Sequence, residues 1–426
     1  MTDPATTVSP LLGLPGAVQS EGIDVGVAAH YGNPIIEQRS LVAGRAIVDL
    51  SHHGVLSVAG PDRLSWLNSI ASQELKSLAP GGSTEMLLLD PTGHLEYAVR
   101  VLDDGVETWL LVEAAELPGL QTFLDRMKFM LRVQVVDHTL VYATIGAMTD
   151  APASVGITAA APNGVPLTWL DPWAAVARGG YQYAEVPEHP GTRWTYTETL
   201  VARASLPALR DSLAAGAAAT AFTATATATA TAPAPAPATS SPTGAAASAE
   251  LVKPAGLLAL EALRIAAWRP RRAREVDEKS IPHELDWLRT AVHLSKGCYR
   301  GQETVAKVHN LGHPPRRLVM LHLDGSEGVL PAPGDPVQAD RVRPGSSEAE
   351  PERVAVGTIT SSAIHYELGP IALAVIKRII PATSTLYVES EGISISASQE
   401  IIVPQSAGSV ADIPRLPRLG ARTPVR

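Results

Sequence analysis

The only cysteine of the 426-residue chain, Cys298, lies in a short segment that combines two cations with two glycines. The segment reads Lys296-Gly297-Cys298-Tyr299-Arg300-Gly301-Gln302-Glu303. Positive charge two residues away on either side favours the thiolate, so Cys298 should be more acidic and more nucleophilic than a free cysteine. The flanking glycines let the backbone approach a ligand closely. A lone cysteine can equally be a small buried apolar side chain, and spacing alone leaves both interpretations open.

The segment also resembles the signature of a known family. Lys296-Gly297-Cys298-Tyr299-x-Gly301-Gln302-Glu303 is similar to the signature of the YgfZ family of folate-binding proteins, relatives of the glycine-cleavage T-protein, an aminomethyltransferase. Upstream, Asp277-Glu278-Lys279-Ser280-Ile281-Pro282-His283-Glu284 resembles the D-E-x-x-I-P-x-E segment that precedes this signature. Weaker resemblance covers Asp49 to Gly60, Asp90 to Val101, Val356 to Ile359 and Ile371 to Val375.

This resemblance implies both a fold and a function. The fold class would be α+β, a T-protein-like tripartite folate-binding fold with a small C-terminal antiparallel β-barrel and a central opening for tetrahydrofolate or a derivative. The function implied is that of an accessory protein, not a conventional enzyme, that supports assembly or repair of iron–sulfur clusters in client enzymes such as tRNA-modifying ones. Cys298 would be its functional thiol. The positions that shape the site would be Lys296, Gly297, Tyr299, Gly301, Gln302 and Glu303.

Two positions depart from the T-protein pattern of acidic residues. In the first hairpin, Glu96 could replace one acid of an Asp-Asp pair, but Tyr97 replaces the other. In the helix that reads L-R-L-E-A-G in the T-protein, Ala266 stands in place of the glutamate that contacts folate. Because losing a charge-assisted hydrogen bond costs about 1.5–3 kcal/mol, aminomethyl transfer is disfavoured. A folate-dependent aminomethyltransferase with Glu96 as a catalytic acid is the alternative function, and Glu96 can also be simply solvated.

Candidate folate contacts come from the same helix and the arginines that follow it. Arg264 lies within an apolar stripe, and its planar guanidinium suits the carboxylates of a folate tail. Trp268 replaces a glycine and could stack on a pterin or anchor the core. Glu261 could substitute for the acid missing at Ala266. The remaining arginines of this basic cluster are Arg269, Arg271, Arg272 and Arg274. The alternative is a solvated helix end, in which Arg272 and Arg274 pair with nearby acids (Glu275, Asp277 or Glu278), and it is the simpler interpretation for Arg271 and Arg272.

A zinc centre is a different interpretation of the residues around Cys298. His309 and His313 follow at zinc-like gaps, and His52-His53 could join them. Zinc usually takes four ligands at recognised spacings, and the residues around His313 are typical of a turn. A single cysteine also cannot hold an iron–sulfur cluster, which usually needs four ligands. We therefore expect no resident metal, and any cluster would be handled transiently with a client protein.

Periodicity indicates the elements that position these residues. Runs of strand-forming residues, with clear alternation in 94–101, predict strands over 54–59, 85–90, 94–101, 106–112 and 131–136, and helices are predicted over 64–71 and 116–130. Leu257, Leu260, Leu263 and Ala267 form a helical stripe that carries Arg264. Later runs at 318–323, 354–360 and 371–379 predict the C-terminal barrel. Strands mixed with helices in this order favour an α+β fold with antiparallel sheets.

Composition sets the expected domain boundaries. Residues 1–25 lack periodicity and are expected to be a disordered lead-in. The folate-binding region would span 26–310, as two subdomains, with a disordered Ala/Thr/Pro insertion at 214–249 that has almost no large apolar side chains to bury. The barrel would span 316–403, followed by a disordered tail over 404–426.

The net charge of −9 gives no bulk attraction to nucleic acid or to an anionic membrane. The sequence contains no apolar run of about 18 residues and no signal peptide pattern. One cysteine excludes an internal disulfide and is consistent with a reducing compartment. We therefore expect a cytoplasmic protein whose partners are a reduced folate and iron–sulfur client enzymes.

Overall fold

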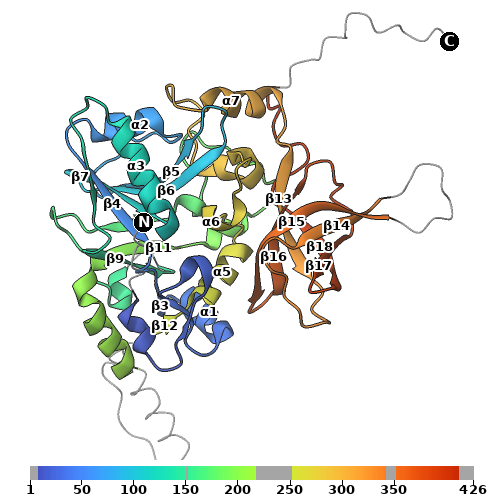
Figure 1. The fold of residues 1–426 in the computed structure, drawn as a ribbon, viewed down its shortest axis with the longest axis horizontal. Coiled ribbons are helices and arrows are strands. Elements are labelled where there is room, and N and C mark those ends of the chain that lie inside the picture. The colour runs from blue at the N-terminus through green and yellow to red at the C-terminus, as the bar shows by residue number, and fades with distance from the viewer. Residues whose placement is uncertain (1–7, 150–151, 217–251, 342–351, 412–426) are drawn as a thin grey trace, which may run out of the picture.

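The computed structural model describes residues 8–149, 152–216, 252–341 and 352–411, which form two five-stranded sheets, a closed barrel and a two-stranded ribbon. Figure 1 shows the barrel on one side of the molecule and both larger sheets on the other. Helix α5 (Leu257–Ala266) packs against the barrel strands and against α1 (Pro34–Val42). The arginines that follow α5 therefore lie where the three parts of the fold meet.

The first sheet carries the hairpin that contains Glu96. Its strand order is β5-β6-β7-β4-β8, and all its neighbours are antiparallel. The strands are β4 (Gly54–Ala59), β5 (Ser83–Leu89), β6 (Leu95–Asp103), β7 (Glu107–Val112) and β8 (Gln134–Asp137). Helices α2 (Arg63–Ile70) and α3 (Leu117–Met127) cover one face, where their buried leucines join Val99 and Val101 in one core.

The second sheet has the order β10-β11-β9-β3-β12. Its strands are β3 (Ala46–Asp49), β9 (Tyr142–Ala147), β10 (Thr168–Leu170), β11 (Thr197–Ala202) and β12 (Lys253–Ala255). The short strand β12 runs parallel to β3, whereas the other neighbours are antiparallel. Because α5 starts two residues after β12, this pairing fixes the origin of the arginine-bearing helix.

The barrel closes in the order β13-β16-β15-β14-β17-β18. Its strands are β13 (Arg316–Leu323), β14 (Pro336–Arg341), β15 (Glu352–His365), β16 (Gly369–Lys377), β17 (Leu386–Ser390) and β18 (Ile393–Ile401). Alternate side chains, such as Val319, Leu321 and Leu323, fill its interior. The barrel interior is thus a packed core of its own.

Short elements complete the connections. The ribbon strands are β1 (Val18–Gln19) and β2 (Ala28–His30), and two further helices are α6 (Arg272–Glu275) and α7 (Gln302–Leu311). The 3-10 turns are Pro10–Gly13, Gly22–Asp24, Ala114–Glu116, Pro152–Val155, Pro172–Ala174, Pro190–Arg193, Arg203–Ser205, Pro282–Leu285 and Trp287–Arg289. Among the described residues, no helix has the length and apolarity needed to cross a membrane.

The predicted α+β class with a C-terminal antiparallel barrel is confirmed. Strand β4 coincides with the predicted 54–59, and β6 and β7 begin within one residue of their predicted starts. Strand β15 is much longer than the predicted 354–360, because it continues through an irregularity between Ile359 and Ser361. Helix α3 ends at Met127, short of 130, because Phe129 adopts a left-handed φ of 41°.

The expected disordered lead-in is a correction for residues 8–25. Leu11 and Leu14 are buried against Ile47 and Ile145, and the carboxylate of Asp24 is buried in the ion network described below. This segment lacks a regular period because it forms 3-10 turns and a two-residue strand, which periodicity does not detect. Residues 1–7 lie outside the described chain.

The two other segments expected to be disordered fall only partly within the described chain. Most of the predicted insertion, 217–249, lies outside it, but residues 214–216 are helical, as part of a helix that begins at 206. In the tail, residues 404–411 are ordered: Ala407 is buried, and the Val410 amide donates to the His309 carbonyl at 3.0 Å. Residues 412–426 lie outside the described chain.

Candidate functional site

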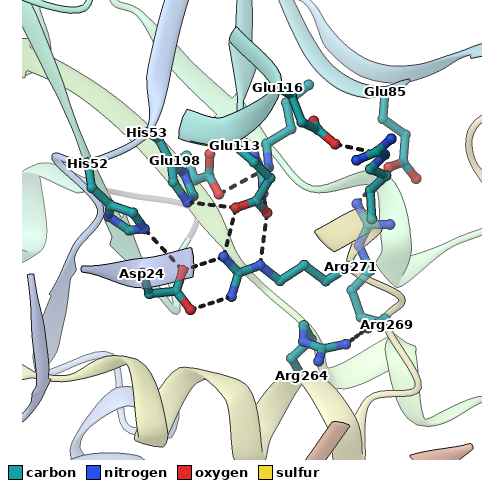
Figure 2. A network of polar contacts seen from close by, with 12 residues as sticks. Asp24, His52, His53, Glu85, Glu113, Glu116, Glu198, Arg264, Arg269 and Arg271 are labelled. Carbon is teal, nitrogen blue, oxygen red and sulfur yellow. Dashed lines mark hydrogen bonds and ion pairs between the residues drawn. The ribbon is translucent and has the colours of Figure 1, made fainter. Parts of the chain in front are cut away.

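A cluster of buried arginines and carboxylates lies between the two five-stranded sheets and α5 (Figure 2). Three arginines enter it from α5 and the chain that follows: Arg264, Arg269 and Arg271 are between 5% and 8% exposed. Charges so far from water persist only when paired and hydrogen-bonded. Their partners come from segments distant in sequence, so the tertiary fold assembles the cluster.

Arg271 occupies the centre of this cluster, between Asp24 and Glu113 (Figure 2). Its Nε and Nη2 donate to Glu113 at 2.8 and 2.7 Å, and its Nη2 and Nη1 donate to Asp24 at 2.5 and 3.2 Å. Burial alone would raise the pKa of the Glu113 carboxyl, but the Arg271 guanidinium outweighs it and holds that pKa well below its usual value. Glu113 is therefore an ionised partner of Arg271.

Arg264 uses all of its donors within the protein. Its Nε and Nη2 donate to Glu261 at 3.0 and 2.8 Å, and its Nη1 donates to the Arg269 carbonyl and to Glu275 at 2.7 and 2.9 Å. Nη2 also donates to the Ser361 hydroxyl at 2.7 Å. Since a guanidinium has five N–H donors, Arg264 has none left for a ligand in this conformation.

Several buried polar atoms of the cluster have no hydrogen-bond partner within the described chain, and two of them are Nη1 of Arg269 and Oε2 of Glu198. Arg269 donates from Nε to Asp171 at 3.0 Å and from Nη2 to Glu85 at 2.7 Å. Glu198 receives only the Tyr196 hydroxyl at 3.2 Å, besides an ion pair with Arg100 at 3.2 Å. Burial raises the pKa of Glu198. Because unsatisfied buried polar groups are costly, these two atoms mark a place for a polar ligand.

Both unpartnered groups line one internal cavity. Its wall includes Arg264 of α5, Arg269 and Arg271 from the chain after it, three aromatic side chains, and carboxylates from both sheets. The aromatic residues are Trp194, Tyr196 and Trp287, and the carboxylates are Glu85, Glu113, Asp171, Glu198 and Glu261. The cavity is narrow, about 70 Å³, because the arginines and their partners fill much of it.

Two further groups of the cluster have shifted proton affinities. Burial, together with the neighbouring His52, keeps the pKa of His53 well below 6.5, so His53 is neutral beside Glu113, 3.6 Å away. Burial raises the pKa of Glu116 to about 7, although Arg272 lies 2.9 Å from it and opposes the shift. Glu116 therefore titrates near neutral pH at the edge of the cluster.

The segment around Cys298 lies apart from this cavity, since none of residues 296–303 is among the described residues that line it. Cys298 itself is exposed. Lys296 is buried and points away into the protein, where its ammonium donates to the carbonyls of Asn68, Ala71 and Gln73 at 2.6–2.7 Å. These carbonyls lie at and just beyond the end of α2, so Lys296 caps that helix.

The second cation of the segment, Arg300, is also committed elsewhere. It donates to the Glu96 carboxylate at 2.7 Å and lies over the Phe123 ring at 5.7 Å. Gly301 takes a φ of 82°, and a Cβ there would lie 2.7 Å from the Asp90 carbonyl oxygen. The glycine thus lets the segment pack on the β5–β6 turn before α7 begins. Neither predicted activating cation is directed at the Cys298 thiol, because the Lys296 ammonium and the Arg300 guanidinium are bonded to other groups.

The remaining motif positions have varied environments. Tyr299 is buried, whereas Gln302 and Glu303 form the first turn of α7, with Glu303 exposed. Gly297 is exposed, and a Cβ there would meet nothing within 4 Å, so this glycine serves no close approach within the described chain. Only Gly301 has the conformational need that the sequence suggested for both glycines.

Of the predicted folate contacts, two residues lie on the cavity wall and one lies in the hydrophobic core. Arg264 and Glu261 line the cavity, but they are bonded to each other. Trp268 is fully buried, adopts a left-handed φ of 59°, and packs edge-on against His189 at 5.2 Å. It is not among the cavity residues, so its position fits a core anchor better than a stacking platform.

The residues considered for zinc are not brought together. His309 contacts the Tyr183 hydroxyl, His313 contacts the Ala407 carbonyl, and His52 contacts Asp24. Within the described chain, no group of three or more His, Cys, Asp or Glu side chains could hold a metal ion.

Sequence reasoning missed most of the acidic half of the cluster. The interpretation of Arg271 as part of a solvated helix end is a correction, because Arg271 is buried against Asp24 and Glu113. Arg272 likewise pairs with Glu116 instead of its sequence neighbours. The sequence contained one signal. Five arginines lie in the eleven residues 264–274, which begin in an apolar helix, so carboxylates must neutralise any of them that are buried. That requirement does not show where in the sequence those carboxylates lie.

Comparison with known proteins first gives the class of fold. The chain is similar in structure to the glycine cleavage system aminomethyltransferase T of Bartonella henselae, with a TM-score of 0.59 over 93% of this chain and 94% of that one. Their sequences are 15% identical, so the likeness shows the fold alone. A heterotetrameric sarcosine oxidase of Corynebacterium matches with a TM-score of only 0.22 and 12% identity, over 42% of this chain and 95% of that one.

The sequence comparison is less specific. A chloroplastic protein of Arabidopsis thaliana named as a transferase is 23% identical over 338 residues, which cover 74% of this chain. This chain spans 64% of the length of that relative. No family model matches the sequence. The protein therefore has the aminomethyltransferase T fold and a distant relative named as a transferase.

Proposed function

We propose that this protein binds a reduced folate in the central cavity and supports iron–sulfur clusters of client enzymes through Cys298. The folate part rests on one observation: in an aminomethyltransferase T fold, Glu198 and Arg269 present unpartnered buried atoms to the cavity. The client part rests on the exposed cysteine and on the signature around it. We place the protein in the cytoplasm, with no direct nucleic-acid or membrane partner.

The chemistry of the cavity wall suits the pterin head of tetrahydrofolate. A pterin offers an amino group and a ring N–H as donors, which match the free carboxylate oxygen of Glu198. Its carbonyl oxygen is an acceptor for the free Nη1 of Arg269. Trp194, Tyr196 and Trp287 supply aromatic surface for the ring. When bound, tetrahydrofolate supplies a carrier for one-carbon units.

The cavity must widen to admit this ligand. Its volume of about 70 Å³ is smaller than the roughly 300–1,000 Å³ usual for small-molecule sites. Arg272 lines the cavity with a side chain that is 34% exposed, whereas its neighbours Arg269 and Arg271 are buried and multiply bonded. Movement of Arg272 is therefore the least costly way to open it, and binding should exchange internal ion pairs for contacts with the ligand.

Calorimetry with tetrahydrofolate tests this site directly. We expect the wild-type protein to bind and Glu198→Gln to bind at least about tenfold more weakly, because a charge-assisted hydrogen bond contributes about 1.5–3 kcal/mol. Glu400→Gln is the matched control, since Glu400 pairs with His322 on the barrel surface. Absence of binding by the folded wild-type protein at high micromolar ligand would refute folate binding.

The role of Cys298 is tested in cells. The exposed thiol can reach a client protein, but one thiolate cannot hold a cluster, so the client must supply the other ligands. We expect Cys298→Ser to fail to restore iron–sulfur enzyme activity in a deletion strain, while Glu400→Gln restores it. Full restoration by the serine variant would remove the thiol from the proposed function.

A transferase is the second candidate, favoured by the aminomethyltransferase T fold and by the name of the distant relative. Glu96 does not support it, since Glu96 lies outside the cavity and is paired with Arg300. Purified protein incubated with methylene-tetrahydrofolate, ammonia and a carrier that bears a reduced lipoyl group distinguishes the two functions, because the aminomethyl group would bond to a lipoyl thiol and release tetrahydrofolate. Methylene transfer that is lost in Glu96→Ala would establish the transferase, and we expect no transfer.

A further inference from the structure

The connection between α3 and β8 exposes an unusual run of apolar side chains. Residues 126–132 read Arg-Met-Lys-Phe-Met-Leu-Arg. Phe129 and Met130 are 87% and 86% exposed, and Met127 and Leu131 are 39% and 43% exposed. Single exposed apolar residues are ordinary, but four within five positions form a contiguous patch of the kind that marks interaction sites.

The 126–132 segment is held firmly at both ends. The Trp66 indole N–H donates to the Met127 carbonyl at 3.2 Å. At the other end, the Arg132 backbone amide, Nε and Nη2 donate to Asp62 at 3.0, 3.0 and 2.8 Å. Because both ends of the segment are anchored, its apolar side chains are held in an exposed position on the protein surface.

Phe129 shows that this presentation costs free energy. Its φ of 41° lies in the left-handed region, where a bulky side chain is rare. Helices commonly end with a glycine in this conformation, because glycine has no Cβ to strain the backbone. Here a phenylalanine takes the position and remains exposed, so the strain gains no burial within the described chain. Strain of this kind concentrates at sites that bind or switch.

The charge of the segment is positive in an acidic protein. It contains three cations and no acid, whereas the whole chain has a net charge of −9. Lys128 and Arg132 pair with Asp125 and Asp62. Arg126 is exposed and forms no ion pair or hydrogen bond with any residue that the structure describes. A partner surface that combines apolar groups with carboxylates would complement this segment.

A surface groove continues from the segment toward the cysteine. Arg126 lines this groove together with Phe123 of α3 and with Glu96 and Tyr97 of β6. Arg300 lies over the Phe123 ring at 5.7 Å and bonds to Glu96, and it is two residues from Cys298. The carboxylates of Asp90, Asp277 and Glu278 also line this groove, so an acidic partner segment would be seated on 126–132 itself, beside the groove.

We propose that residues 126–132 are the docking surface for a client protein, through a client segment that carries apolar side chains and carboxylates. This inference rests on the proposed function and names the chemistry of its partner. A membrane is a poorer occupant, because one unpaired cation on a chain of charge −9 gives little attraction to anionic lipid. A second copy is also poorer, because a symmetric contact would bring together two copies of a segment that has no acid to pair with Arg126.

The probe for this surface is an acidic amphipathic helical peptide of about 18 residues, with leucine on one face and glutamate on the other. Fluorescence anisotropy with the full chain measures its affinity. We expect binding that falls at least about tenfold in the double variant Phe129→Ser/Met130→Ser and several-fold in Arg126→Glu. Ile379→Ser is the matched control, because Ile379 is 70% exposed on the barrel side of the fold.

The outcomes separate this proposal from its alternatives. Peptide binding that is lost in the double variant and kept in Ile379→Ser supports it. Failure of the wild-type protein to bind, or equal binding by the double variant, overturns it. Binding of phosphatidylserine–phosphatidylcholine vesicles that depends on Phe129, or a dimer that depends on Phe129 in sedimentation, would also overturn it. Tetrahydrofolate calorimetry on the same variants is expected to be unchanged, so failure of docking is distinguishable from failure of folate binding.

Discussion

The central cavity and the Cys298 loop differ in how their charges are used. In the cavity, Arg264 and Arg271 are buried and bonded to carboxylates from several parts of the chain. In the loop, Lys296 caps α2 and Arg300 pairs with Glu96, while the Cys298 thiol between them is exposed. The recognisable sequence motif and the dense chemistry therefore lie in different places, so a motif alone does not locate a ligand site.

The strongest way to break this comparison is to remove Arg271. Arg271→Met leaves Asp24 and Glu113 without their main cation, and breaking a buried ion pair typically costs about 3–5 kcal/mol. We expect a large drop in the denaturant midpoint for unfolding. Arg300→Met, in the loop, should cost less than about 1 kcal/mol because its pair with Glu96 is partly exposed. Similar losses for both variants would contradict the distinction.

A substitution of Lys296 tests whether the base of the Cys298 loop has a structural role. Lys296→Met removes a charged donor from three carbonyls near the end of α2, so we expect a loss on the order of 1.5–3 kcal/mol in thermal or denaturant unfolding. Lys76→Met, at a position that offers no such bonds, is the control. A Lys296 variant as stable as wild type would show that the capping contacts contribute little.

Glu116 gives the cluster a pH dependence. Its folded pKa of about 7 lies above the usual 4.5, so the folded state binds the proton more tightly than the unfolded state. The favourable contribution of Glu116 is complete below pH 4.5 and is lost as pH rises from 4.5 to 7, by up to about 1.4 kcal/mol per pH unit. Denaturant midpoints of the wild type minus those of Glu116→Gln, measured across this range, should fall with pH. A flat difference would contradict a buried, protonated Glu116.

The smallest effect on stability is expected at Cys298. Since the side chain is exposed, Cys298→Ser should change the free energy of unfolding by no more than about 0.5 kcal/mol. A thiol reagent should modify Cys298 in the folded protein, and saturating tetrahydrofolate should leave the rate unchanged because the loop lies outside the cavity. Protection by folate would join the two regions into one site.

The fold was more predictable from sequence than the cavity. The β-rich run in 54–59, the alternation in 94–101 and the apolar stripe of α5 predicted elements near their observed positions. The cavity depends on contacts over long sequence separations, such as Arg271 with Asp24, which no local pattern encodes. Asp24 itself lies in a segment without periodicity, and Glu198 lies in a strand whose sequence has no unusual feature. Their roles become visible only when the sheets bring them to the arginines.

The pairing of β12 with β3 has a consequence for how the chain can be divided. Among the described residues, those from β12 onward contact those before residue 217 through that parallel pair, through the ion pairs of Arg269 and Arg271 with Glu85, Glu113 and Asp24, and through packing of α5 on α1. The two parts of this single polypeptide therefore meet at an interface of the kind found between the subunits of a heterodimer. Two fragments, 1–216 and 252–426, produced separately, should associate non-covalently and form the cavity between them.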